Sequence, residues 1–155
     1  MAHLTALELT IAKLEQAGVK YEIIPHGRAI HSARDGEEIL GIKRGDAAPN
    51  LIALVDGRPV SAIIPGDRWL DFKKLATVAG GQECRLADPG TVERATGSTL
   101  GAVPLLTDLP TFIDEELMEK LFVYGGSGDP FQTVKIAPAE LLRATGGAVA
   151  SICRG

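Results

Sequence analysis

Aromatic residues, cysteines and long apolar runs are all scarce in this chain of 155 residues. No apolar stretch approaches the roughly 20 residues that a membrane-spanning helix needs, and the N-terminal segment lacks the basic start of a secretion signal. Cys84 and Cys153 are the only cysteines and lie far apart, without the paired spacing of a zinc or redox site. We therefore expect a soluble cytoplasmic protein, without a membrane partner, whose cysteines are reduced structural thiols.

Motifs for metal binding and covalent catalysis are also absent. His3, His26 and His31 are the only imidazoles, and no Glu or His lies at helical spacing from them, so we expect no metal and no cofactor. No serine occupies a Gly-x-Ser-x-Gly elbow. The acidic run 114–116 has no spacing that identifies a general acid and base, and we interpret it as a solvated turn.

An excess of positive charge is missing as well. The chain has 16 Lys and Arg against 20 Asp and Glu, for a formal net charge of −4. This balance excludes an extended surface that coats nucleic acid but permits a local basic patch, for which the candidates are Lys43, Arg44, Arg68, Lys73 and Lys74. Such a scatter is also typical of a solvated face.

Apolar residues are as frequent as in globular proteins, and glycines are abundant. Apolar residues make up 45% of the sequence and charged residues 23%, close to the average of globular proteins, while 18 glycines indicate many turns. A chain of this length is long enough to bury one sizeable core. We therefore expect a single domain over residues 1–155.

Short helices are predicted between the strands. Capping residues, apolar spacing and glycine stops predict helices over residues 5–17, 32–40, 71–78, 89–96 and 138–145. Strands are predicted over residues 19–26, 50–55, 60–65, 84–88, 110–117, 120–126, 133–136 and 148–153, with a hairpin turn at Asp56-Gly57. The pattern indicates an α+β fold with a curved, mixed, partly barrel-like sheet flanked by short helices.

Two glycine-rich segments and one amide are candidates for chemistry. In "TGSTLGAVP", Gly101 lets backbone amides face outward, where they suit an ester oxygen that gains negative charge during hydrolysis. In "YGGSGDP", backbone amides and the Ser127 hydroxyl could line a pocket, although the segment lacks the Gly-Lys-Ser/Thr ending of a phosphate-binding loop. Asn50 offers both a donor and an acceptor at the start of a strand. An ordinary turn is the simpler interpretation of each glycine-rich segment, and Asn50 is alternatively a simple turn residue.

Taken in order, these segments resemble the YbaK/EbsC family of aminoacyl-tRNA deacylases, which also occurs as a domain inserted in bacterial prolyl-tRNA synthetases. The resemblance covers roughly residues 5–153. It rests on "PNLIALV", "AIIPGDRWLDFKKL", "LADPGTVERATGSTLGAVP", "LPTFIDEEL", "VYGGSG" and "APAELLRATGG". Its most specific part is the ordered set ATG, LGAVP, YGG and ELLRATGG.

The resemblance implies hydrolysis of the ester between a wrong amino acid and tRNA, with no metal. The implied partners are the acceptor end of mischarged tRNA and an aminoacyl-tRNA synthetase. Water attacks the ester carbonyl in this family with help from the terminal ribose hydroxyl, which explains why no protein nucleophile is found. The resemblance assigns catalysis to Asn50 and Gly101, and substrate binding to Pro49, Ala102, Val103, Pro104, Gly125, Gly126 and Ser127.

One departure from the family pattern concerns Pro49. The family carries a lysine before the position of Asn50, and proline removes both its charge and a backbone N–H. Lys43 and Arg44 in the preceding turn are candidates to replace that cation. Two hypotheses follow, a trans-editing hydrolase and a non-catalytic module that binds aminoacyl-tRNA or aminoacyl-adenosine without turning it over.

Overall fold

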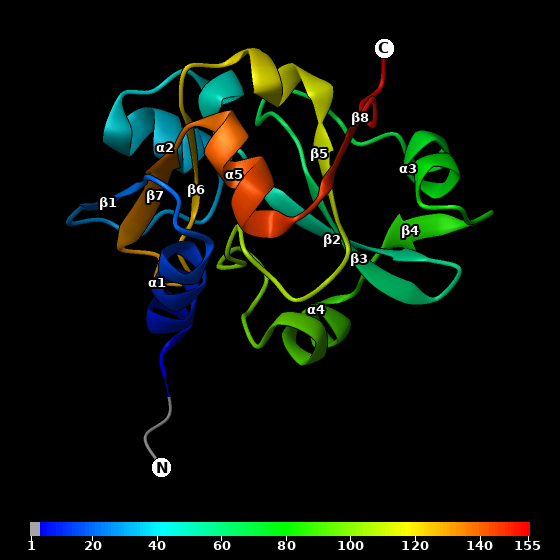
Figure 1. The fold of residues 1–155 in the computed structure, drawn as a ribbon, viewed down its shortest axis with the longest axis horizontal. Coiled ribbons are helices and arrows are strands. Elements are labelled where there is room, and N and C mark those ends of the chain that lie inside the picture. The colour runs from blue at the N-terminus through cyan, green and yellow to red at the C-terminus, as the bar shows by residue number, and fades with distance from the viewer. Residues whose placement is uncertain (1–3) are drawn as a thin grey trace.

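The computed structural model describes residues 4–155 as two β-sheets with five α-helices and two short 3₁₀ helices around them (Figure 1). The first sheet is antiparallel and has the order β1 (Glu22–Pro25), β7 (Gln132–Ile136), β6 (Val123–Gly126). The second has the order β4 (Cys84–Leu86), β2 (Asn50–Val55), β3 (Arg58–Ile63), β5 (Thr111–Asp114), β8 (Ala148–Ala150). In this second sheet β4, β2 and β3 are antiparallel, whereas β3, β5 and β8 are parallel.

The helices begin and end close to the predicted residues. They are α1 (Ala6–Ala17), α2 (Ala33–Leu40), α3 (Phe72–Val78), α4 (Pro89–Thr96) and α5 (Pro138–Thr145), with 3₁₀ helices η1 (Arg44–Asp46) and η2 (Glu115–Glu119). Thr5 and Glu8 form a reciprocal capping box at the start of α1, which satisfies two amides that the helix leaves free. The 3₁₀ helices were not predicted, because they contain only three and five residues.

The hairpin β2–β3 confirms the turn predicted at Asp56-Gly57. Both residues have positive φ, 50° and 81°, as a tight two-residue turn between twisted strands requires. The register pairs Asn50 with Ile63 and Val55 with Arg58, so the whole length of both strands is matched.

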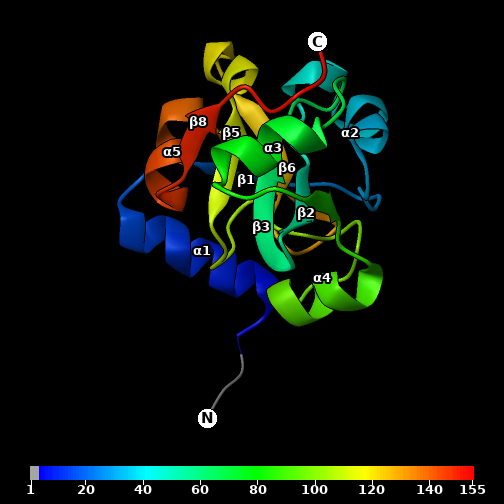
Figure 2. The same cartoon turned by 90° about the vertical axis from the view of Figure 1, so that its right-hand side faces the viewer.

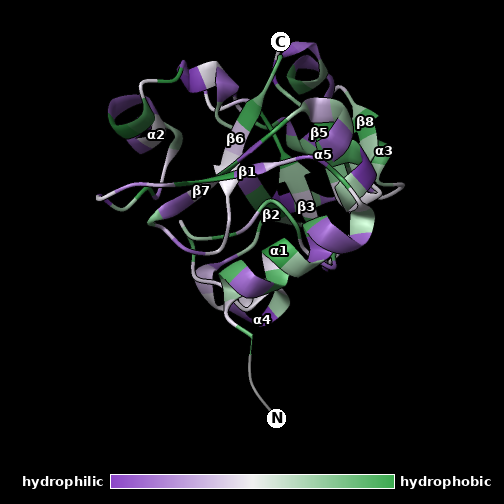
Figure 3. Cartoon of the chain, turned by 60° about the vertical axis from the view of Figure 1, so that its left-hand side comes forward, coloured by the Kyte–Doolittle hydropathy of each residue, from purple (hydrophilic) through white to green (hydrophobic). Residues whose placement is uncertain are grey.

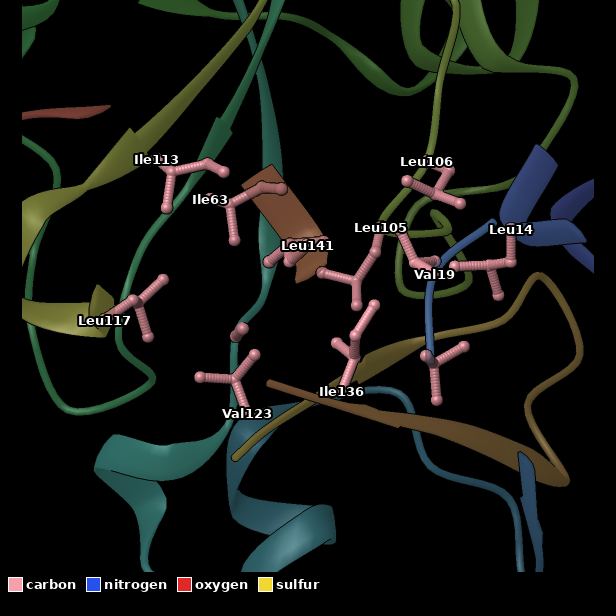
Figure 4. Packing of buried hydrophobic residues seen from close by; sticks show 12 residues of the cluster. Leu14, Val19, Ile63, Leu105, Leu106, Ile113, Leu117, Val123, Ile136 and Leu141 are labelled. Carbon is pink, nitrogen blue, oxygen red and sulfur yellow. The ribbon is translucent and has the colours of Figure 1, made fainter. Parts of the chain in front are cut away.

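Two apolar clusters pack on the two faces of the five-stranded sheet. The larger cluster lies between that sheet, the three-stranded sheet, α1 and α5 (Figure 4), and it includes Leu14, Ile63, Leu105, Ile136 and Leu141. The smaller cluster joins Val60, Ala62 and Ile64 to α3 and the C-terminal segment, and α3 lies in front of the strands in Figure 2. Consecutive residues of β3 therefore serve opposite cores, as the alternation of a strand requires.

The two sheets meet without closing into a barrel. A parallel bridge pairs Ala47 with Tyr124, and the Ala48 amide donates to the Tyr124 carbonyl over 2.8 Å. The predicted mixed α+β architecture is confirmed, and the chain ahead of β2 is held against β6. This junction positions the candidate site.

Asp114 corrects the interpretation of the acidic run as a solvated turn. Its side chain is only 3% exposed; Oδ1 accepts a hydrogen bond from the Ile152 amide at 3.0 Å, and Oδ2 accepts one from the Glu116 amide at 3.1 Å. The carboxylate therefore caps η2 and holds the C-terminal segment. Its neighbour Cys153 is buried, and this burial, together with the nearby Asp114 charge, raises the pKa of the Cys153 thiol to about 12.

In Figure 3, α1 alternates between hydrophobic and hydrophilic residues, as expected for a helix with one face on the core. Within residues 4–155, no helix is both long and apolar enough to cross a membrane.

Candidate functional site

A cavity of about 370 Å³ lies where the two sheets meet. Its lining comes from the segment before α2 and the inner face of α2, from the residues leading into β2 and the first half of β2, and from the end of β4. The loop 100–103, the end of β6 with the loop that follows it, and the start of β7 complete the wall. These segments are far apart in the sequence. The fold therefore assembles one concave site from both glycine-rich segments and the start of β2, which is the usual form of a small-ligand site.

The cavity wall is mostly apolar and carries no permanent positive charge. Leu40, Ile42, Ile52 and Leu86 line it, and within residues 4–155 no Lys or Arg does. Asp129 is also part of the wall, but its Oδ1 accepts from the Phe131 amide and its Oδ2 from the Gln132 side chain. An uncompensated charge would be costly in these surroundings, so the cavity suits a neutral group.

Asn50 is held by its amide nitrogen and keeps its oxygen free. Nδ2 donates to the Pro104 carbonyl at 3.0 Å and to the Ser61 hydroxyl at 3.3 Å. Because a carbonyl can only accept, this contact fixes which end of the amide is nitrogen. Oδ1 is buried and has no hydrogen-bond partner within residues 4–155. Such an atom is costly to bury without a partner, which makes Asn50 a candidate functional residue of the cavity wall.

Pro49 lies in the cavity wall at the point where the chain passes from one sheet to the other. Its carbonyl accepts from the Ile64 amide at 3.2 Å, and as proline it has no N–H that would need a partner between Ala48 and the start of β2. The two cations proposed to replace the family lysine do not line the cavity. Lys43 is exposed, and Arg44 pairs with Glu37 at 3.3 Å.

The loop 97–104 contributes three residues to the cavity wall, and the amides of two of them have no protein acceptor within residues 4–155. Gly101, Ala102 and Val103 line it, and Gly101 has a φ of 89°, which favours glycine. The Ala102 amide donates to the Thr99 carbonyl at 2.9 Å, so it is already used. Within residues 4–155, the amides of Gly101 and Val103 have no protein acceptor. Pro104 is outside the lining, and its carbonyl receives the Asn50 amide.

Gly125 and Gly126 let this loop approach β6. A Cβ atom on Gly126 would lie 2.4 Å from the Val103 carbonyl oxygen, and one on Gly125 would lie 2.5 Å from the buried side chain of Leu105. The Leu105 amide donates to the Gly126 carbonyl at 2.9 Å. Both glycines line the cavity, but their close contacts also give them a structural reason to be glycine.

Ser127 lines the cavity with its hydroxyl turned toward its own loop. The side chain is fully buried; Oγ contacts the Gln132 carbonyl at 2.6 Å and the Asp129 carbonyl at 3.1 Å, and it accepts from the Asp129 amide. The hydroxyl therefore shapes the loop after β6.

His31 is a cavity residue that the sequence analysis did not select, because imidazoles were considered there only as metal ligands. It is exposed at the rim, directly before α2, and its backbone amide donates to Asp35 Oδ2 at 3.0 Å. His26 instead has both ring nitrogens occupied, by the Arg28 carbonyl and the Thr133 hydroxyl. His3 lies outside the described residues, and within residues 4–155 no three His, Cys, Asp or Glu side chains are grouped to hold a metal.

Comparison with protein families gives one match to most of the chain. The family described as aminoacyl-tRNA editing domain matches residues 28–144, a range that contains the whole cavity wall.

Individual relatives have related names. EbsC of Enterococcus faecalis, named as a Cys-tRNA(Pro)/Cys-tRNA(Cys) deacylase, is 30% identical over 125 residues, which cover 78% of this chain and 76% of EbsC. ProXp-y of Escherichia coli K12, named as a multifunctional Ser/Thr-tRNA deacylase, is 34% identical over 98 residues, covering 61% of this chain and 58% of ProXp-y. A crystal structure named as a trans-editing enzyme for prolyl tRNA synthetase superposes with a TM-score of 0.83 at 26% identity, covering 99% of this chain and 100% of that one.

Proposed function

The chain belongs to the aminoacyl-tRNA editing domain family, and on that premise we propose that it is a trans-acting hydrolase of mischarged aminoacyl-tRNA. The bond cleaved is the ester between the amino acid and the terminal ribose of the tRNA, and the products are a free amino acid and uncharged tRNA. The names of EbsC and ProXp-y as tRNA deacylases support this assignment. The observation that carries it is the pair of free amides, on Gly101 and Val103, at the wall of the cavity.

Hydrolysis of the aminoacyl ester requires a polarised carbonyl group and a water molecule held in position to attack it. When water attacks the ester carbonyl, its oxygen gains negative charge, and backbone N–H groups fixed in advance stabilise that charge without any proton transfer. Gly101 and Val103 supply such donors. Asn50 Oδ1 has no partner within residues 4–155, and in this proposal it is the acceptor for a proton-bearing group of the substrate. In this scheme the remaining residues assigned to binding, including Pro49, Ala102, Gly125 and Gly126, form the wall around the aminoacyl group.

The wall also limits which amino acids fit. A charged side chain would lose its hydration without gaining a partner, because no Lys or Arg lines the cavity and the Asp129 carboxylate is already hydrogen-bonded. The substrates proposed are therefore tRNAs carrying uncharged amino acids. The proposed contact is with the acceptor end of the tRNA, in the cytoplasm. Prolyl-tRNA synthetase is the proposed associated synthetase, supported by the name of the matching crystal structure.

A second candidate function is binding without turnover. The lack of any lysine or arginine in the cavity wall favours it, because a cation is the simplest stabiliser of a developing oxyanion. Such a module would retain aminoacyl-adenosine or aminoacyl-tRNA in the same cavity.

The hydrolysis rate of a panel of correctly and wrongly charged tRNAs, with the purified chain against a buffer blank, separates the two functions. Acceleration confined to one or a few mischarged species is the result expected of an editing hydrolase. A flat panel combined with retained binding of aminoacyl-tRNA would identify a binding module. A flat panel without binding would contradict both.

A further inference from the structure

The rim of the cavity brings one imidazole against the loop that carries the free amides. A Cβ atom built on Gly101 would lie 3.5 Å from His31 Cβ and 3.7 Å from His31 Nδ1. The His31 ring therefore stands directly beside the glycine whose amide has no acceptor. Segments 70 residues apart in the chain meet at this point of the wall.

The His31 backbone is fixed while its ring is uncommitted. Its amide donates to Asp35 Oδ2, and the next residue, Ser32, caps α2 by accepting from the Asp35 amide at 3.1 Å. Within residues 4–155, the ring nitrogens of His31 make no hydrogen bond to the protein. An imidazole always carries at least one N–H, so the ring has a donor available to a ligand.

Ser32 and Tyr124 also line the cavity with hydroxyl groups that donate no hydrogen bond within residues 4–155, but the side chain nearest to a Cβ atom built on Gly101 is that of His31. Lysine and arginine do not line the cavity, the Asn50 amide nitrogen is committed to Pro104 and Ser61, and the Ser127 hydroxyl is committed to its own loop. An ester oxygen next to Gly101 therefore has two kinds of donor within reach, the loop amides and the imidazole.

We propose that His31 donates a hydrogen bond to the ester carbonyl oxygen of the aminoacyl group, beside the Gly101 amide, and so stabilises the charge that develops there. The inference rests on the proposed hydrolase function. Within residues 4–155 no Lys or Arg lines the cavity to stabilise the oxyanion. The His31 imidazole would supply part of that stabilisation. Loss of one such donor commonly lowers the catalytic rate by about 100-fold or more.

Two replacements of His31 separate hydrogen bonding from packing. His31→Phe keeps a planar ring of similar shape and removes the donor, whereas His31→Gln removes the ring and keeps a donor. Both leave the backbone contact with Asp35 in place. Arg34→Gln is the matched control, because Arg34 is exposed in the first turn of α2, three residues after His31, and does not line the cavity.

The experiment measures kcat and KM for the best substrate of the tRNA panel, together with the Kd of an amide-linked, non-hydrolysable aminoacyl-tRNA analogue. We expect His31→Phe to lower kcat by about 100-fold with a change in Kd of less than about threefold, and His31→Gln to recover at least about tenfold of that loss. Arg34→Gln should match the wild type.

Equal rates for folded His31→Phe and wild type would overturn the role of His31 and leave the hydrolase function standing. Equally low rates for the Phe and Gln variants would show that ring shape, not donation, is what matters, and would also overturn it. A wild type that binds the analogue but hydrolyses no member of the panel would instead overturn the hydrolase function itself, and this role of His31 with it.

Discussion

Gly101 and Gly126 lie on the two glycine-rich segments of the cavity wall, and they are glycine for different reasons. Gly126 has no room for a Cβ atom, which would lie 2.4 Å from the Val103 carbonyl oxygen, a backbone atom that cannot move aside cheaply. Gly101 has room, since the nearest atom to its Cβ position is 3.5 Å away, but its φ of 89° is one that other residues rarely adopt. One segment is constrained by packing, and the other by its backbone conformation.

The comparison implies that a substitution at Gly126 in β6 lowers the stability of the fold, whereas a substitution at Gly101 in the loop lowers the deacylation rate. Gly126→Ala should give the largest loss of stability, about 3 kcal/mol, because the added methyl group drives the loop away from β6. Urea unfolding measures this. Activity lost without any loss of stability would show that the close contact is not what requires glycine there.

Asn50 holds the loop that contains Gly101, because its side chain donates a hydrogen bond to the carbonyl of Pro104 at the end of that loop. Asn50→Leu should destabilise the fold by about 2 kcal/mol, since it leaves the buried Pro104 carbonyl unpaired. It should also lower deacylation more than the unfolded fraction explains, because the free Oδ1 disappears. Thermal unfolding and single-turnover deacylation, run on the same preparation, test both parts. A rate that simply follows the folded fraction would reduce Asn50 to a structural residue.

Substitutions at Pro49 test whether a positive charge in the cavity wall would raise the deacylation rate. Pro49→Lys places an ammonium group on the cavity wall and should raise the deacylation rate by about tenfold, provided that the strand start accepts the new N–H. Pro49→Ala is the control for the loss of the ring alone. No gain in a folded Pro49→Lys variant would mean that the site has rebuilt its charge stabilisation elsewhere.

Short sequence motifs predicted the helices and the hairpin. The environment of individual side chains depends on contacts between distant segments and was not predictable in this way. Thr5, Gly18 and the Asp56-Gly57 turn gave helix and hairpin boundaries, because capping and tight turns depend on neighbours in sequence. That Asp114 is buried could not be predicted, since its partner Ile152 lies 38 residues further along the chain.

Most of the residues predicted for the site line the cavity and Pro104 does not, while their roles stay predictions. The glycine-rich segments and Asn50 do line one cavity, as their unusual composition suggested. Position 125 requires glycine because a Cβ atom there would collide with Leu105, which the sequence does not reveal. The hydrogen bond of the Ser127 hydroxyl to its own loop depends on how that loop closes. His31 carries no motif at all, and only the fold brings it beside Gly101.

The most direct test of the account compares Gly101→Val with Gly146→Val. Both glycines have positive φ, 89° and 62°, so a β-branched residue strains the backbone at either site, but only Gly101 lines the cavity. The measurement is the deacylation rate of the best mischarged tRNA, per folded molecule. The account predicts that Gly101→Val loses at least about 100-fold of the rate while Gly146→Val keeps it. Equal rates for the two variants would contradict the placement of the editing site at this loop.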